Sequence, residues 1–376
     1  MEDRGGQQKT ERREEASLLP EERLLFHLRR LYMQYGYRPY RMSKFEKYEL
    51  YAGNKDFLVS DRVITFTDTN GELLALKPDV TLSIVKSAQF QEKRVERLYY
   101  QENVYRPSGS DGQFREILQC GLECIGDLDS YGLYEVLHLA DESLRIVSEN
   151  SVLCFSHLGI LKSLFGALQA GEVQQKQLLG LIAARNLHEL SALFEERNWD
   201  AGLLRDVAAL LTLSCPLSRL PEELCALELS WLEEEVLQEV RVLAELSSRT
   251  EDRTRFDFSV INDIHYYNGL VFQGFVRGVS EKLLSGGRYD SLLARMDRKG
   301  AAAGFAVYLS LLEQLLRPQE TAEADVLLLY DENTDLSAVQ NAADALRAEG
   351  KRVSAQRTEE GQFARILDLR KEAQHA

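Results

Sequence analysis

The sequence predicts an α+β fold, in which β-hairpins and helices form one large domain that holds a helical insertion and is followed by a short α/β segment. Three observations predict this fold. Asn70-Gly71 lies within an alternating stretch, residues 58–76, and this dipeptide strongly favours a tight hairpin turn. Residues from about 150 to 250 are rich in Leu, Ala and Glu and poor in Gly, which indicates helices rather than a continued sheet. Residues 325–356 follow a strand–helix–strand pattern.

The first 150 residues predict three helices and a second pair of strands. Apolar residues recur at helical spacing over 18–35, 78–90 and 133–144. Two segments with strand character, 97–105 and 115–125, surround a polar turn.

The last part of the chain predicts a return to strands and then a separate module. Residues 256–276 have strand character, and 301–316 follow a long helical pattern. We therefore expect three parts: a disordered charged tail over 1–17, a large domain over 18–320, and a short β-α-β module over 325–376.

Net charge, apolar runs and cysteine content indicate which partners and which cellular location to expect. The 376 residues carry a net charge of −15, which lowers the odds that nucleic acid is the main partner and favours a protein or small-molecule partner. No apolar run long enough for a transmembrane helix and no signal peptide are present, so we expect a cytoplasmic protein without membrane association. The five cysteines contain no CxxC pair and are expected to be buried reduced thiols; no metal site and no cofactor are predicted.

The segment 117–125 is the first candidate for a binding surface. With a period of two, its apolar residues and its polar residues fall on opposite faces of a strand. The apolar face carries Leu118, Cys120, Leu122 and Cys124, and the other carries Gln119, Gly121 and Glu123. A carboxylate and a carboxamide on either side of a glycine could form the floor of a small-ligand site. A solvated face of the sheet is the alternative interpretation.

Three further segments carry weaker signals. Asp79 and Thr81 lie together at the start of a helix, where Asp could serve only the helix dipole. Tyr266 and Tyr267 are expected on opposite faces of a strand. The segment 286–290, Gly-Gly-Arg-Tyr-Asp, is a strand–turn–helix junction that lacks the spacing of a P-loop or dinucleotide fingerprint.

Taken in order, these segments resemble the catalytic domain of class II histidyl-tRNA synthetases over residues 37–316. The resemblance implies a class II synthetase-like antiparallel sheet flanked by helices, and it makes 325–376 a remnant of an anticodon-binding-like domain. It is carried by Leu76-Lys77-Pro78-Asp79-Val80-Thr81, by Tyr105-Arg106-Pro107-Ser108 with 113–123, by His265-Tyr266-Tyr267-Asn268, and by 286–290 with 303–316.

The same resemblance implies a histidine site. It places Asp79, Thr81 and Gln119 at the α-ammonium group, because carboxylates and amides pair well with a cation. It places Glu123 and the tyrosines at the imidazole, where a carboxylate opposite an N–H selects for histidine. The histidine-binding residues would be Asp79, Thr81, Gln119, Glu123, Tyr266 and Tyr267, and phosphate or other ligand contacts would come from Arg106, Arg115 and Arg288.

The departures from the synthetase pattern change the expected function. Asn262 and Leu311 stand where the family has arginines that handle ATP phosphate or the activated carboxyl group, and Ser43 and Ser108 replace a proline and a glutamate. Loss of two cationic groups is hard to reconcile with adenylyl transfer, so no catalytic residues are expected.

The combination resembles the regulatory subunits of ATP phosphoribosyltransferase. That resemblance implies a short-form catalytic subunit as partner, feedback control by histidine, self-association as a dimer within a hetero-octamer, and no tRNA partner. A free-standing histidine sensor and a divergent histidyl-tRNA synthetase are the alternatives.

Overall fold

The computed structural model describes residues 18–58, 60, 62–88, 94–108, 112–248, 253–261, 266–312 and 323–370. The expectation of a disordered tail over 1–17 therefore lies outside the described residues. The chain divides into two compact units, Met1–Leu315 and Leu316–Ala376, each built around its own sheet. Among the residues that the structure describes, none of the helices is both long and apolar enough to span a bilayer.

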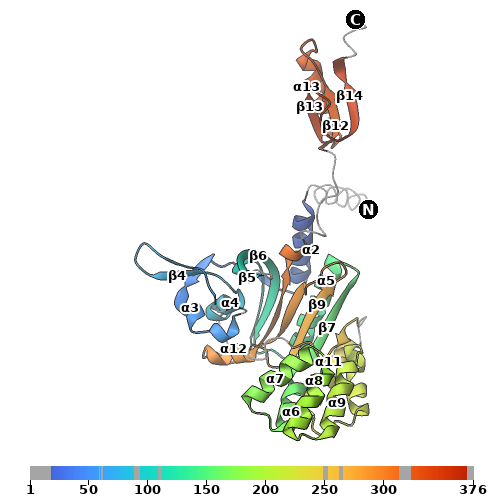
Figure 1. Cartoon of the computed structure of the whole chain (residues 1–376). Coiled ribbons are helices and arrows are strands. Elements are labelled where there is room, and N and C mark those ends of the chain that lie inside the picture. The colour runs from blue at the N-terminus through green and yellow to red at the C-terminus, as the bar shows by residue number, and fades with distance from the viewer. Residues whose placement is uncertain are drawn as a thin grey trace. The chain divides into compact units, whose positions relative to one another are not determined.

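An eight-stranded, largely antiparallel sheet forms the centre of the first unit, and it confirms the predicted α+β class (Figure 1). Only the two edge pairs, β1 with β5 and β7 with β8, run parallel. In spatial order the strands are β1 (Arg38–Pro39), β5 (Val95–Ser108), β6 (Gln113–Gly126), β11 (Ala301–Tyr308), β10 (Leu284–Arg288), β9 (Leu270–Val276), β7 (Ser151–His157) and β8 (Arg255–Phe256).

Two long helices, α2 (Pro20–Gln34) and α5 (Ser130–Val147), pack on one face of this sheet. Tyr32 of α2 is fully buried there, with its ring 6.1 Å from that of Phe305 and its hydroxyl 3.0 Å from Ser143 of α5. Strand β6 turns its even-numbered residues to this side, as the sequence predicts. This face is closed by apolar packing, which leaves the opposite face for a site.

A second layer covers the opposite face. It holds a small sheet in which β4 (Leu73–Leu76) lies between β2 (Phe45–Lys47) and β3 (Thr65–Thr67). The hairpin predicted around Asn70-Gly71 is confirmed, since β3 and β4 pair antiparallel. The short helices of this layer are α3 (Tyr48–Ala52), η1 (Lys55–Phe57), α4 (Thr81–Ser87) and α12 (Asp290–Arg295), and they share one apolar cluster with β5 and β6.

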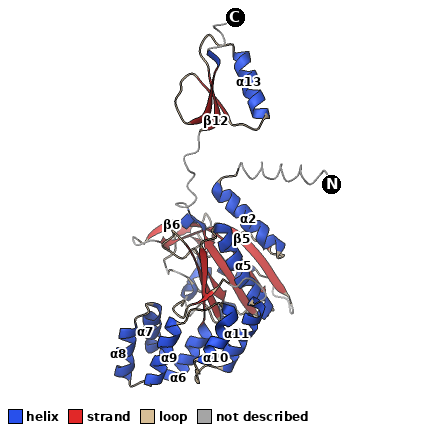
Figure 2. Ribbon diagram, turned by 90° about the vertical axis from the view of Figure 1, so that its right-hand side faces the viewer, coloured by secondary structure: helices blue, strands red, loops and turns tan. Residues whose placement is uncertain are grey.

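The helical insertion begins later than the sequence predicts. Residues 151–157 form β7, which pairs antiparallel with β9 inside the main sheet. Average composition over a hundred residues hides this seven-residue strand. The helices that follow gather at one end of the unit: α6 (Leu158–Leu168), α7 (Glu172–Ala183), α8 (Leu187–Arg197), α9 (Ala201–Thr212), η2 (Leu217–Arg219), α10 (Leu220–Ala226) and α11 (Glu234–Ser247) (Figure 2).

The prediction of a long helix over 301–316 is wrong. Residues 301–308 form strand β11, and only the short 3₁₀ helix η3 (Leu309–Leu312) follows within the described residues. Ala301-Ala302-Ala303 favours a helix by local propensity. Between β6 and β10, however, small side chains are what a crowded central strand accommodates, so sheet pairing overrides the local preference.

The C-terminal unit has one strand more than the predicted β-α-β pattern. Strand β12 (Ala324–Leu329), helix α13 (Leu336–Ala348) and β13 (Val353–Gln356) follow the prediction, and β14 (Phe363–Asp368) adds a third parallel strand. The five cysteines are free thiols, but Cys225 is exposed and Cys154 half-buried, so the expectation that all are buried is wrong.

Candidate functional site

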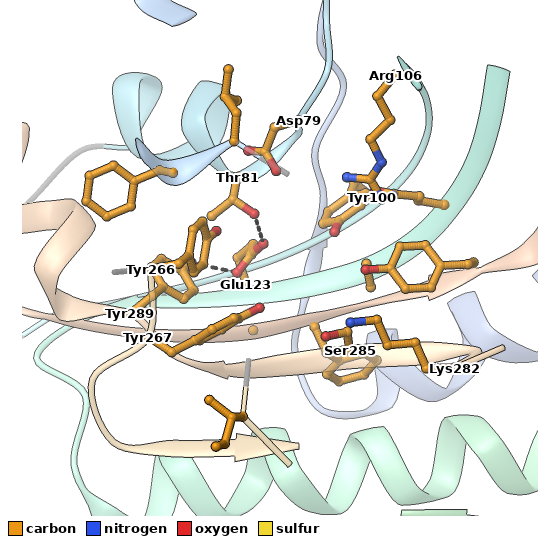
Figure 3. Close-up of a pocket in the computed structure, with 18 residues that line it drawn as sticks. Asp79, Thr81, Tyr100, Arg106, Glu123, Tyr266, Tyr267, Lys282, Ser285 and Tyr289 are labelled. Carbon is orange, nitrogen blue, oxygen red and sulfur yellow. Dashed lines mark hydrogen bonds between the residues drawn. The ribbon is translucent and has the colours of Figure 1, made fainter. Parts of the chain in front are cut away.

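A cavity of about 330 Å³ opens over the odd-numbered face of β6 (Figure 3). All six residues expected to bind the ligand line it: Asp79, Thr81, Gln119, Glu123, Tyr266 and Tyr267. They come from three segments that are far apart in sequence, namely the start of α4, the middle of β6 and the loop before β9. The structure thus brings together the residues that the sequence analysis grouped.

The floor of the cavity is buried rather than solvated. Gln119 is 4% exposed and Glu123 is 2% exposed, so the alternative of a solvated sheet face is wrong for this part of β6. Strand β6 is covered on both faces, by α2 and α5 on one side and by the second layer on the other, and β5 and β11 pair with its two edges. Polar groups buried in such a place require partners, in the protein or in a ligand.

Glu123 is held by two hydroxyl donors. Thr81 Oγ1 donates to Glu123 Oε1 at 2.7 Å, and the Tyr289 hydroxyl donates to Glu123 Oε2 at 2.5 Å. Burial raises the pKa of Glu123 to about 8 against the lowering effect of these two bonds, and the nearby Asp79 carboxylate raises it further. The group is therefore poised to gain or lose a proton near neutrality, and a ligand that brings an N–H or a positive charge would favour its ionised form.

Two glycines make room for this arrangement. A Cβ atom at Gly304, which lies opposite Glu123 on β11, would overlap the Glu123 carboxyl group. A Cβ atom at Gly121 would come within 2.7 Å of the Tyr100 hydroxyl. The carboxyl group and the tyrosine can lie flat over the sheet only because these positions have no side chain.

Asp79 accepts a backbone hydrogen bond at the start of α4 and also lines the cavity. Its Oδ1 accepts a hydrogen bond of 2.8 Å from the Leu82 backbone N–H, so the helix-start interpretation is part of its role. The side chain lines the cavity, and burial raises the pKa of Asp79 against the lowering effect of the backbone N–H donors and of the Arg106 charge. Behind it, Lys77 is 1% exposed and forms an ion pair of 2.5 Å with Glu102 of β5. That pair fixes the turn from which Asp79 and Thr81 project.

Tyr266 and Tyr267 lie on the same side of the sheet, contrary to the prediction of opposite faces. Residues 266–269 form a loop before β9 rather than part of a strand, so the period of two does not apply to them. Their rings lie 4.6 Å apart, and the Tyr266 ring lies 5.6 Å from that of Tyr289. We call Tyr266, Tyr267 and Tyr289 the tyrosine cluster.

The three candidate arginines lie in different places. Arg106 lines the cavity, with its guanidinium carbon 5.6 Å from the centre of the Tyr308 ring. Arg288 faces away, because it pairs with Asp290 at 2.8 Å and with Glu239 of α11 at 3.4 Å. Arg115 lies opposite Arg106 in the β5–β6 hairpin on an exposed stretch and does not line the cavity. Of the three, Arg106 alone is placed to contact a ligand there.

The two positions that lack the arginines of the synthetase pattern are Leu311 and Asn262. Leu311 lies in η3 and does not line the cavity. Asn262 lies outside the described residues. Among the described residues, no group of three or more His, Cys, Asp or Glu side chains is arranged to hold a metal ion.

The sequence did not predict several of the residues that line the cavity: Tyr100, Lys282, Ser285, Tyr289 and Tyr308. Tyr289 lies in the Gly-Gly-Arg-Tyr-Asp segment, which pointed to the region but not to the side chain. Lys282 precedes β10 in a polar turn and carries no sequence signal. The sheet register, which places β11 beside β6 and β10 beside β11, shows that residues of these strands reach the same cavity.

The sheet and the cavity together define a class II synthetase-like protein, with a small-molecule site on one face of an antiparallel sheet. The family model for histidyl-tRNA synthetase matches residues 12–312, and the chain belongs to this family. A curated relative from Oceanobacillus iheyensis, named ATP phosphoribosyltransferase regulatory subunit, is 27% identical over 335 residues, which cover 86% of this chain and 82% of the relative.

Two solved structures have the same fold. An ATP phosphoribosyltransferase regulatory subunit/histidyl-tRNA synthetase from Bacillus halodurans matches with a TM-score of 0.74 and 23% identity over 93% of both chains. A chain of the ATP phosphoribosyl transferase (HisG:HisZ) complex from Thermotoga maritima matches with a TM-score of 0.60 and 19% identity, over 77% of this chain and 97% of that chain.

Proposed function

We propose that this chain is the regulatory subunit of an ATP phosphoribosyltransferase, the name carried by its curated relatives. In this proposal it has no catalysis of its own and is required for the activity of a short-form catalytic subunit in the first step of histidine biosynthesis. It takes part in feedback control by binding histidine, and it assembles as a dimer within a hetero-octamer with that partner.

The observation that carries the proposal is the buried Glu123 carboxyl group beside the tyrosine cluster. A carboxylate can accept the N–H of an imidazole, and a cluster of aromatic rings suits a flat heterocycle. Asp79 and Gln119 supply acceptors for an ammonium group on the same side of the sheet. These features support histidine as the ligand.

The surroundings of the cavity favour binding over activation. Of the residues that the structure describes, only Arg106 and Lys282 bring a positive charge to its lining. Adenylyl transfer relies on several fixed cations that stabilise the developing charge on phosphate. Leu311, an apolar residue in η3, cannot replace a guanidinium.

The test combines this chain with a short-form ATP phosphoribosyltransferase from the same organism. The mixture should form phosphoribosyl-ATP from ATP and phosphoribosyl pyrophosphate faster than the catalytic subunit alone, and histidine should reduce that rate. Glu123→Ala should keep the activation and weaken the inhibition, because a ligand shifts an equilibrium only through unequal affinity for its two states. Glu195→Ala, at an exposed site on α8, is the control and should change neither.

The outcome distinguishes the alternatives. A catalytic subunit that is fully active alone and indifferent to this chain would contradict the regulatory proposal. A rise in melting temperature of a few degrees with histidine, lost in Glu123→Ala, would then favour a free-standing histidine sensor. Absence of any such shift would contradict histidine binding itself.

A further inference from the structure

The cavity has acidic and hydroxyl groups at one end and basic groups at the other. The Glu123 carboxyl group and the tyrosine cluster occupy one end, and Asp79 lies above the middle (Figure 3). The side chains of Arg106 and Lys282 lie at the other end, away from the tyrosines (Figure 3). The expected ligand contacts from the sequence included Arg106 but not Lys282.

The strand register fixes this polarity. Glu123 lies opposite Gly304, and Gln119 lies opposite Tyr308, so the two ends are four residues apart along β6, or about 13 Å between backbones. The Tyr308 backbone N–H donates to the Leu283 carbonyl at 2.8 Å, which holds the turn that carries Lys282 beside this end. Arg106 approaches from β5, over the Tyr308 ring.

The Arg106 charge acts on the nearby Asp79 carboxyl group, but neither Arg106 nor Lys282 forms an ion pair with a described residue. Among the described residues, no carboxylate lies within ion-pair distance of either side chain, although Arg106 is only 9% exposed. Burial lowers the pKa of Lys282 where its ammonium group enters the cavity, and the Arg106 guanidinium lowers it further. Two like charges held together in a partly buried place are unfavourable unless an anion joins them.

We propose that Arg106 and Lys282 together bind the α-carboxylate of the amino acid, with Lys282 as the residue that sets specificity for a free carboxylate. The inference rests on the proposed histidine function and deepens it. A zwitterionic ligand would match the charges of the cavity, with its carboxylate at the two cations, its ammonium group at Asp79 and its ring at Glu123.

The experiment measures the binding of two ligands by calorimetry to the full chain. L-histidine carries the carboxylate, and L-histidinol has a hydroxymethyl group in its place. The wild type should bind histidine about tenfold or more tightly than histidinol, since a charge-assisted contact is lost. Lys282→Met should weaken histidine binding by about tenfold and leave histidinol unchanged. Lys176→Met, which removes an exposed lysine on α7, should change neither affinity.

Each outcome has one meaning. Equal affinities for the two ligands in the wild type, or equal weakening of both by Lys282→Met, would overturn the carboxylate subsite while histidine binding stands. If inorganic phosphate binds to the histidinol complex only when Lys282 is present, and the two ligands bind alike, the subsite serves a separate anion and the inference is wrong. If neither ligand binds the wild type, the proposed histidine function itself fails.

Discussion

At the scale of single residues, Glu123 connects the fold to the chemistry of the site. Its carboxyl group is buried because the second layer covers this face of β6, and two hydroxyl donors from separate elements orient it. Desolvation dominates those two bonds, so the pKa of the group rises to about 8. The same burial that costs stability for the empty protein makes the group responsive to a ligand that carries N–H donors.

Glu123→Gln should change how stability depends on pH. The folded protein holds the Glu123 proton up to a pKa of about 8, whereas the ordinary value is 4.5, so the folded state binds more protons between these values. The stability that this group contributes is present below the ordinary pKa and is lost as pH rises through the folded pKa, by about 1.4 kcal/mol per unit. The amide cannot ionise and should remove this contribution in urea unfolding measured from pH 5 to 8.

The matched control is Glu195→Gln on the exposed side of α8, which should leave the pH dependence as in the wild type. Identical slopes for the wild type and Glu123→Gln would show that the buried carboxyl group does not titrate in this range.

At the scale of elements, the site depends on how the start of α4 is held over the sheet. Lys77 anchors this turn through its buried ion pair with Glu102, and the Tyr105 backbone N–H donates to the Lys77 carbonyl at 2.9 Å. The loop before β9 is fixed in a comparable way, since Asn268 N–H donates to the Arg288 carbonyl at 3.0 Å and Arg288 pairs with Glu239 of the insertion. Arg288 therefore helps to hold the loop that carries Tyr266 and Tyr267.

Lys77→Met should destabilise the fold by roughly 3–5 kcal/mol, because it leaves the Glu102 carboxylate without its buried partner. Unfolding in urea provides the measurement. The exposed pair between Lys47 and Glu72 offers a control in the same layer, and Lys47→Met should destabilise the fold far less than Lys77→Met. Similar losses for the two variants would contradict a structural role for the buried pair.

At the scale of the whole molecule, a synthetase-like sheet and cavity are combined with a strongly acidic chain. The net charge of −15 opposes general attraction to a polyanion such as tRNA. The C-terminal unit has a core of its own, built from Val326, Leu328, Val339, Ala343 and Leu369. These features fit a protein that acts through a protein partner and a small ligand.

The whole chain should show no histidine-dependent exchange of pyrophosphate into ATP. The reason is that the described lining of the cavity holds only two cationic side chains and that position 311 is the apolar Leu311. Radiolabelled pyrophosphate exchange, with a histidyl-tRNA synthetase as positive control, measures it directly. Exchange above the blank that disappears in Arg106→Ala would show that the chain still activates histidine.

The sequence by itself determined the fold class and the faces of β6. Alternation along 117–125 reports which side chains share a face, whatever the strand packs against, and the confirmed positions of Gln119 and Glu123 follow from it. The grouping of Asp79 and Thr81 with these residues came from the order of segments, which persists in related sequences because the fold constrains it.

Tertiary structure alone decided the identity of β11 and the positions of Tyr267, Lys282 and Arg288. The local pattern predicts a helix over 301–308, but this segment forms a strand because it hydrogen-bonds to two neighbouring strands. Tyr267 lies in a loop, where no period links sequence to direction. Arg288 points away from the cavity because it pairs with Glu239 and Asp290. Lys282 lines the cavity because the Tyr308 backbone holds the turn that carries it. Contacts between distant segments set these positions, and such contacts leave no local pattern in the chain.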